Sequence, residues 1–170
     1  RHCRRRRSGV RTVTVAPVDL PQPELEFVFE VRVSVADELR IGRSAEEVLH
    51  FVAITGGTVA GPRLTGEVLA HGGDWFVERG DTVQLDARYV LRADDGSLID
   101  VRNRGYYRAD SSVESRLDAG EVVDERDYYY RTAPVFQTDS EQFRWLADNQ
   151  FLGMARNEGG QICIRFFWLR

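Results

Sequence analysis

Apolar and polar residues alternate along much of this chain, most clearly over residues 25–35. Every second residue there is apolar, and the intervening positions include two glutamates, an arginine and a serine. This period of two is typical of a strand with one buried and one solvent-facing side. Similar runs, separated by glycine- and aspartate-rich turns, predict strands at 48–55, 63–69, 75–79, 82–92, 97–108, 127–138, 150–156 and 161–169.

Helix signals are few in comparison. Residues 111–119 predict one helix that a serine can cap and Gly120 can end, and residues 140–147 predict a second, shorter one. Sequential strands joined by short turns, with no strand–helix alternation, predict an all-β protein, an antiparallel up-and-down barrel with one or two short helices. We expect a single barrel domain over residues 25–170 after an Arg-rich lead-in at 1–24, with an interior that can hold one small ligand.

The composition narrows the classes of function. At 170 residues, 42% hydrophobic and 29% charged, the chain predicts one globular domain, and no apolar run approaches the length of a membrane helix. The net charge of −4 disfavours nucleic-acid binding. All 23 basic residues are arginine, so Schiff-base and P-loop chemistry, which need lysine, are excluded. A homo-oligomer remains open.

Metal and cofactor signals are missing from the sequence. The two cysteines and three histidines have neither zinc-site nor disulfide spacing, and the glycine pairs read as turns and not as phosphate loops. We therefore expect no metal and no cofactor. A buried, reduced Cys163 suggests a reducing compartment, so the expected location is cytoplasmic.

Charged and amide side chains concentrate on the hairpin formed by residues 82–92 and 97–108. If residues 93–96 form a four-residue loop, Asp86 faces Asn103, and Arg88 shares their face. Were that face interior, Asp86 could act as a base while Arg88 stabilises negative charge. The residues alone favour the simpler alternative, an Asp–Arg pair that ties two strands together, and a one-residue slip would change the faces.

Aromatic residues near these positions extend the candidate site. Trp75 follows a glycine turn like a rim residue, and the tyrosine-rich segment 128–132 contains Tyr129 and Arg131, which suit the wall of a pocket. We treat Asp86 and Arg88 as candidate catalytic residues. Candidate ligand-binding residues are Trp75, Asn103, Tyr129 and Arg131.

Several blocks of sequence resemble the bacterial and fungal family called domain of unknown function 3237. They are the run 54–69, Gly-Gly-Asp-Trp ending at Trp75, Leu-Asp-Ala-Arg-Tyr ending at Tyr89, Val-Arg-Asn-Arg-Gly ending at Gly105 and Tyr-Tyr-Arg-Thr ending at Thr132. The resemblance covers residues 25–169 and implies a lipocalin-like, calycin-type barrel without an established activity. Family motif positions fall on Gly57, Gly61, Asp74, Trp75, Asp86, Arg88, Tyr89, Arg102, Asn103, Arg104 and Arg131.

Two features depart from that family pattern. The Arg-rich start lies outside it, and Ala147-Asp148 follows Trp145-Leu146 where an asparagine is expected directly. The second departure leaves the role of that loop open.

These observations support a small-molecule-binding barrel. One hypothesis is a cofactor-free isomerase, cyclase or lyase that moves a proton on a compact, oxygen-rich ligand, which the arginines suggest to be anionic. The alternatives are a non-catalytic carrier or sensor that uses the same pocket, and a purely structural barrel module. The sequence does not decide whether the protein is an enzyme.

The Arg-rich start gives a first testable prediction. Residues 1–7 contain five arginines and no apolar pattern, so we expect them to add little to the stability of the domain. Deleting them should leave the melting temperature unchanged in a thermal-unfolding experiment. A drop of more than a few degrees would contradict this interpretation.

Overall fold

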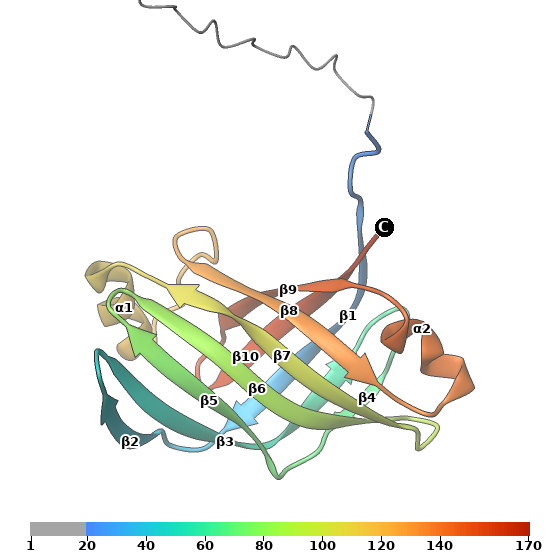
Figure 1. Ribbon diagram of the computed structural model, residues 1–170, viewed down its shortest axis with the longest axis horizontal. Coiled ribbons are helices and arrows are strands. Elements are labelled where there is room, and N and C mark those ends of the chain that lie inside the picture. Colours follow the sequence, from blue (N-terminus) through green and yellow to red (C-terminus); the bar gives the residue numbers. More distant parts are fainter. Residues whose placement is uncertain (1–19) are drawn as a thin grey trace, which may run out of the picture.

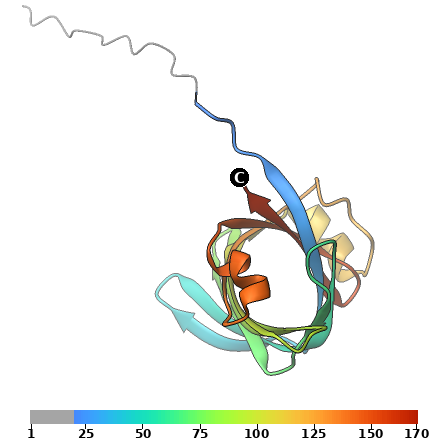
Figure 2. The same cartoon turned by 90° about the vertical axis from the view of Figure 1, so that its right-hand side faces the viewer.

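Residues 20–170 are described by a computed structural model, in which ten antiparallel strands form one sheet. Strand β1 pairs with β10 on one side and with β3 on the other, which closes the sheet into a barrel (Figures 1 and 2). β4 and β5 share the place between β3 and β6, and β2 pairs with β3 alone. The barrel wall therefore has eight strand positions, which confirms the predicted fold class.

The elements follow one another in the predicted order, except that strand β2 was not predicted. Their bounds are β1 Leu25–Val35, β2 Leu39–Ser44, β3 Glu47–Ala60, β4 Gly66–Val68, β5 Gly72–Arg79, β6 Thr82–Ala93, β7 Leu98–Arg108, α1 Ser111–Asp118, β8 Tyr129–Gln137, a 3₁₀ turn Glu141–Phe143, α2 Arg144–Ala147, β9 Phe151–Asn157 and β10 Gln161–Leu169. The Arg-rich lead-in predicted for 1–24 lies almost wholly outside the described residues. No helix within residues 20–170 is long and apolar enough to cross a bilayer.

Strand β3 is longer than the sequence predicts. It passes through Gly56 and Gly57, which we expected to end it, and continues to Ala60. A Cβ atom on Gly57 would clash with the carbonyl oxygen of Arg32 on β1. The glycine therefore lets β3 lie against β1, and this contact closes the barrel.

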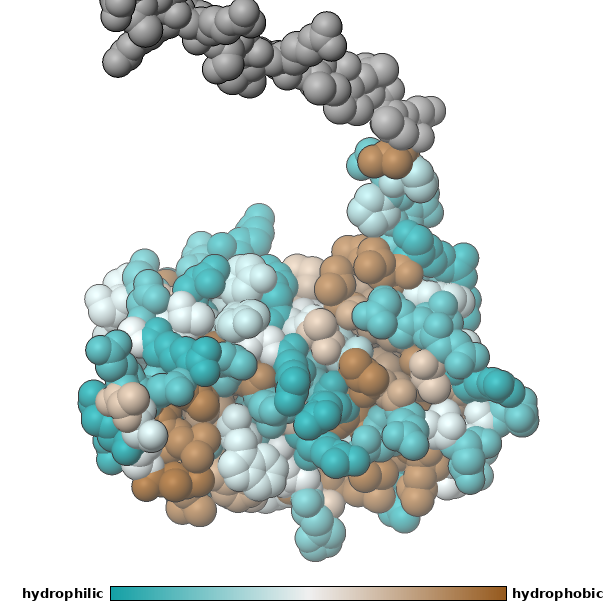
Figure 3. Space-filling view, in the orientation of Figure 1, coloured by the Kyte–Doolittle hydropathy of each residue, from teal (hydrophilic) through white to brown (hydrophobic). Residues whose placement is uncertain are grey.

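Strand β1 also departs from strict alternation. A β-bulge between Phe27 and Phe29 places Val28 and Phe29 together in the core. Leu25 and Phe27, predicted to be buried, are consequently exposed. On the face of the molecule that Figure 3 shows, apolar patches are interrupted by polar side chains. Whether the protein is a homo-oligomer stays a prediction.

Aromatic side chains fill one end of the barrel. Phe29, Phe136, Phe151 and Phe166 pack with ring centroids 5.1–6.0 Å apart, mostly edge to face. Burying each ring stabilises the fold by about 1.5–3 kcal/mol. The short helix α2 lies across this end, where its buried Leu146 joins the same cluster (Figure 2). This end of the barrel is therefore closed.

Helix α1 lies at the opposite end of the barrel (Figure 1). Its N-cap is Asp110, whose carboxylate accepts hydrogen bonds from the backbone N–H groups of Ser112 and Val113, both at 2.9 Å. Val113 is the one buried residue of the helix, and it packs in a small cluster with Val123 and Tyr128. Because α1 buries so little, it borders this end of the barrel without filling it.

The β6–β7 hairpin has a register one residue away from the predicted one. Its loop is Asp94–Gly96, because the backbone N–H of Ala93 already bonds to the carbonyl of Ser97 at 2.9 Å. Gly96 adopts a left-handed φ of 88°, and the carboxylate of Asp95 accepts the Ser97 N–H at 2.9 Å. These contacts select a three-residue loop. Asp86 consequently faces Arg104, and Asn103 faces Ala87.

The tight packing of β7 against β8 gives the second prediction. A Cβ atom at Gly105 would overlap the backbone of Arg131 and Thr132, which cannot move aside. Gly105→Ala should therefore lower the free energy of unfolding by about 1–3 kcal/mol in urea denaturation. The control is Arg104→Ala on the outer face of the same strand, expected to cost less than about 1 kcal/mol. Similar losses in both variants would refute this register.

Candidate functional site

The two candidate catalytic residues lie on the outer wall of the barrel. Asp86 pairs with Arg104 at 2.9 Å and Arg88 with Asp100 at 3.1 Å, and the Asp86 and Arg88 side chains are 39% and 65% exposed. The prediction that both point into the barrel is wrong, because the observed register places Val101 and Ile99 of β7 opposite Tyr89 and Leu91 of β6, and this shared apolar face is the inner one. They form the cross-strand ion pairs of the structural alternative, with Arg104 and Asp100 as partners.

The candidate binding residues divide between the two faces. Trp75, 49% exposed, packs outside the barrel on Phe51 with ring centroids 4.5 Å apart. Tyr129 also lies on the outer face, where the Arg131 guanidinium stands 5.6 Å from its ring. Asn103 alone points inward, with 2% of its surface exposed.

A cavity of about 510 Å³ occupies the half of the barrel beside α1. Its walls are mainly aliphatic, with Val33, Ile54, Leu85 and Ile164 among the lining residues. These side chains are smaller than the phenylalanines that fill the other half, so the space between them stays open. The volume suits one small organic ligand.

Asp74 is the carboxylate on the inner wall of this cavity. Alternation along β5 turns Asp74, Phe76 and Glu78 toward the cavity and Trp75 away from it. The carboxylate accepts a hydrogen bond from the backbone N–H of Asp86 at 2.9 Å. Burial disfavours its charged form and raises its pKa to about 6, and the charge of Asp86 adds to the shift. Asp74 can therefore both donate and accept a proton near neutral pH.

Tyrosine hydroxyls surround the same space. Burial raises the pKa of Tyr89 and of Tyr130, and the charge of Asp74 raises both further, so both phenols stay protonated at neutral pH. The amide of Asn103 is near enough to Tyr89 to oppose part of its shift. Even so, neither the Tyr89 hydroxyl nor Asn103 Oδ1 has a hydrogen-bond partner of good geometry among residues 20–170. Such buried groups are usually satisfied, so both are available to hydrogen-bond a bound molecule.

Acidic side chains form the outer part of the cavity. Glu38 and Glu78 line it on either side of His50, whose Nδ1 contacts Glu38 and whose Nε2 lies 3.4 Å from a Glu78 carboxylate oxygen. Glu114 and Asp118 reach it from α1. With Asp74, all five charged residues that line the cavity are carboxylates. This overturns the expectation of an arginine-lined site for an anionic ligand.

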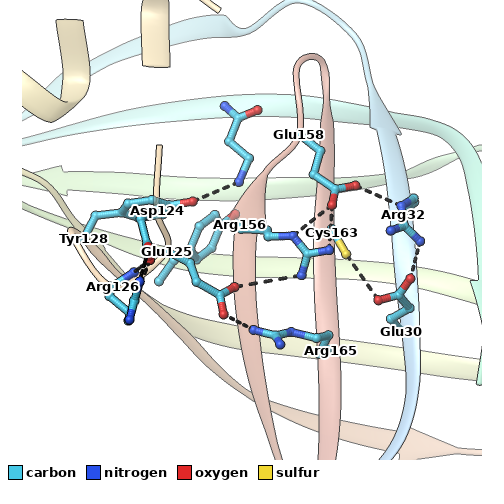
Figure 4. Close-up of polar contacts among 12 residues, drawn as sticks. Glu30, Arg32, Asp124, Glu125, Arg126, Tyr128, Arg156, Glu158, Cys163 and Arg165 are labelled. Atoms are coloured by element: carbon cyan, nitrogen blue, oxygen red, sulfur yellow. Dashed lines mark hydrogen bonds and ion pairs between the residues drawn. The ribbon is translucent and has the colours of Figure 1, made fainter. Parts of the chain in front are cut away.

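A second polar cluster lies on the outside of the barrel, where β10 meets β1, β9 and the segment before β8 (Figure 4). Arg32 bonds to Glu158 at 2.9 Å, Arg156 bonds to the same carboxylate at 2.6 Å, and Arg165 pairs with Glu125. Each cation has an anionic partner, so the cluster ties neighbouring strands together and leaves no charge for a ligand.

Cys163 lies beneath that cluster as a buried free thiol. Its Sγ is 3.7 Å from a Glu30 carboxylate oxygen, and burial raises its pKa to about 11. The thiol therefore stays protonated and unreactive at neutral pH. Among residues 20–170, no three acidic, cysteine or histidine side chains are grouped so that they could hold a metal ion.

Sequence reasoning missed most of the residues that line the cavity. Asp74 and Tyr89 appeared only as family motif positions, and Glu114 and Asp118 were not singled out. One usable signal was the period of two across Asp74, Phe76 and Glu78, which places a carboxylate on the same face as an aromatic residue. No local sequence pattern indicates that Glu114 and Asp118 of α1 reach the cavity, because their position depends on where the barrel closes.

Comparisons with known proteins agree with this fold. Residues 23–169 match the family described as Protein of unknown function (DUF3237). A UPF0311 protein of Rhodopseudomonas palustris is 30% identical over 145 residues, which cover 85% of this chain and 95% of the relative. A hydroalkoxylation enzyme of Penicillium herquei is 27% identical over 126 residues, covering 73% of this chain and 68% of that enzyme.

Two solved structures have the same architecture. The crystal structure of a conserved protein of unknown function from Rhodopseudomonas palustris superposes with a TM-score of 0.81 at 29% identity, covering 89% of this chain and 99% of that one. A beta-barrel like protein from Acinetobacter baumannii gives a TM-score of 0.78 at 28% identity, covering 91% and 100%. From the family match over nearly all of the described residues, we conclude that this chain belongs to the DUF3237 family of proteins of unknown function.

Proposed function

We propose that the protein is a cofactor-free acid–base enzyme that adds a hydroxyl group across a carbon–carbon double bond within a small substrate and so closes a ring. The observation that carries the proposal is the Asp74 carboxyl on the inner wall of the cavity, whose pKa burial raises to about 6. A group that titrates near the working pH transfers protons most effectively. The tyrosines beside it supply protonated hydroxyls that orient an oxygen-bearing substrate.

The chemistry balances without a cofactor. The protonated Asp74 carboxyl gives its proton to one alkene carbon, and the π electrons form the new C–H bond. The substrate hydroxyl oxygen forms the C–O bond to the other carbon, which has become electron-poor, and its proton passes to the Asp74 carboxylate. Asp74 thereby returns to its starting form.

The charge of the cavity suits this reaction. Positive charge develops on carbon as the alkene is protonated, and the remaining carboxylates around the cavity favour such a charge. The faces of Tyr107 and Tyr130 act in the same direction, because the π-face of an aromatic ring attracts cations. Both effects are stronger in the transition state than in the neutral substrate, which is the condition for faster turnover.

The hydroalkoxylation enzyme of Penicillium herquei supports this reaction class. It is a distant relative, 27% identical, and its activity belongs to that protein. A carrier or sensor would use the same cavity, but it would have no need of a carboxyl that titrates near neutral pH. The role of Asp74 therefore separates an enzyme from a carrier.

The third prediction tests Asp74 with 2-(3-methylbut-2-enyl)phenol as probe. In D₂O the protein should convert it to 2,2-dimethylchroman with deuterium at C3, measured by NMR. Asp74→Asn should slow conversion at least about 100-fold, because the amide keeps the shape but transfers no proton. The control Asp100→Asn, on the outer wall, should keep the wild-type rate. The proposal fails if wild type converts no alkenyl phenol or alcohol of a small panel, or if Asp74→Asn remains fully active.

The fourth prediction concerns pH and needs no substrate. The pKa of Asp74 is about 6 in the folded protein and 3.8 in the reference state. Ionisation of Asp74 therefore lowers the free energy of unfolding progressively between pH 3.8 and about pH 6, and by a constant amount above that pH. Below pH 3.8 it has no effect. Asp74→Asn removes this loss of stability. Relative to wild type, the variant should gain up to about 3 kcal/mol of unfolding free energy between pH 4 and pH 8, measured in urea. A loss over that interval would show that the carboxyl is not desolvated.

A further inference from the structure

Three acidic residues that line the cavity differ from the carboxylates on the outer faces of the neighbouring strands. Many of those outer carboxylates are paired with arginines, as in Asp86–Arg104 and Arg92–Glu67. By contrast, Asp74, Glu114 and Asp118 have no ion-pair partner in the part of the chain that the structure describes. Like charges held around one space repel each other and focus a negative potential into it. The electrostatic potential in the cavity therefore favours a positively charged ligand.

Aromatic rings stand beside these carboxylates. The Tyr107 and Tyr130 rings both line the cavity and meet edge to face, with centroids 5.3 Å apart. Burial raises the pKa of the Tyr107 phenol, and Glu114, which lies close enough to hydrogen-bond its hydroxyl, raises the pKa further, as does the charge of Asp118. Carboxylates combined with aromatic faces are the surroundings that hold an ammonium group in proteins.

The inner wall offers an independent sign of a ligand. The Tyr89 side chain lines the cavity and is 3% exposed, and its hydroxyl has no hydrogen-bond partner of good geometry within residues 20–170, although the Asn103 amide is nearby. Buried hydroxyls are normally hydrogen-bonded, so the Tyr89 hydroxyl is available to a polar group of a bound molecule. Aliphatic side chains, among them Val33, Ile54 and Leu85, line the same space. The cavity thus combines polar groups, an apolar wall and carboxylates.

We propose that the cavity binds an organic ammonium compound. Its protonated amine lies between Glu114, Asp118 and the ring of Tyr107, its apolar body lies among the aliphatic side chains, and a polar group at its far end meets the Tyr89 hydroxyl. The proposal rests on the cavity being the site proposed above, and it names the substrate class of that site. Carboxylates and phosphates of the same shape are excluded by repulsion from the five acidic residues.

Three probes with one apolar body test the charge preference. 1-Naphthylmethylamine, 1-naphthalenemethanol and 1-naphthoate are cationic, neutral and anionic at pH 7. Titration calorimetry at low salt should give affinities in that order, with the amine at least about tenfold tighter than the alcohol. Raising the salt concentration should reduce the difference in affinity between the amine and the alcohol, because screening weakens the attraction between the ammonium group and the carboxylates at the open mouth.

Variants of the mouth identify the groups responsible. The double variant Glu114→Gln/Asp118→Asn should lower the affinity for the amine at least about tenfold and leave the affinity for the alcohol unchanged, which also shows that the cavity is intact. The matched control is Glu141→Gln/Asp148→Asn, which removes the same charge beside α2 at the closed end. This control should bind the amine like wild type.

The outcomes separate this inference from the proposed function. Naphthoate binding as tightly as the amine, equal losses in the two double variants, or no binding of any probe at millimolar concentration would overturn the ammonium site. The Asp74-dependent conversion of the alkenyl phenol could still hold in that case. Conversely, a preference for the amine with no turnover of any alkene would support the ammonium site and refute the proposed enzymatic activity.

Discussion

The pairing of β1 with both β3 and β10 is the constraint on which the rest of the structure depends. It turns an open sheet into a barrel and gives each strand an inside and an outside. Gly57 makes this closure sterically feasible, because a side chain at that position would meet the backbone of Arg32. Once the wall is closed, alternation along each strand decides which residues reach the cavity.

Alternation is also the part of the fold that the sequence predicts well. The barrel class, the order of the strands and both helical segments follow from hydrophobic period and turn residues. Register is harder, because the predicted four-residue loop and the observed Asp94–Gly96 loop differ by one residue, which decides the face of β6 that the apolar residues of β7 share. A hydrogen bond of Asp95 and the left-handed backbone of Gly96 select the shorter loop, and a pattern of hydrophobic and polar positions does not contain that information. The predicted register groups Asp86 and Arg88 with the apolar residues of β7, whereas the observed one leaves both on the outer wall.

The candidate site is less predictable than the fold because its parts come from distant segments. Asp74 belongs to β5, Tyr89 to β6, Tyr130 to β8 and Glu114 to α1, and only the closed barrel brings them together. The chemistry of Asp74 follows from its burial, which no neighbouring residue in the sequence announces. Family motif positions included Asp74 and Tyr89, but without a geometry they could not be distinguished from Asp86 and Arg88 on the outer wall.

The partnership of β1 and β10 also determines when the barrel can form. Glu30 and Cys163, whose side chains are in contact across these two strands, stand 133 positions apart in the chain. A ribosome adding about 5–20 residues per second needs about 7 to 27 seconds to cover that distance. Throughout that time β1 is complete and lacks one of its two neighbours, so its apolar positions are available to other unfinished chains. Contacts this distant also slow folding, which lengthens the time for which β1 is open to pairing with other chains.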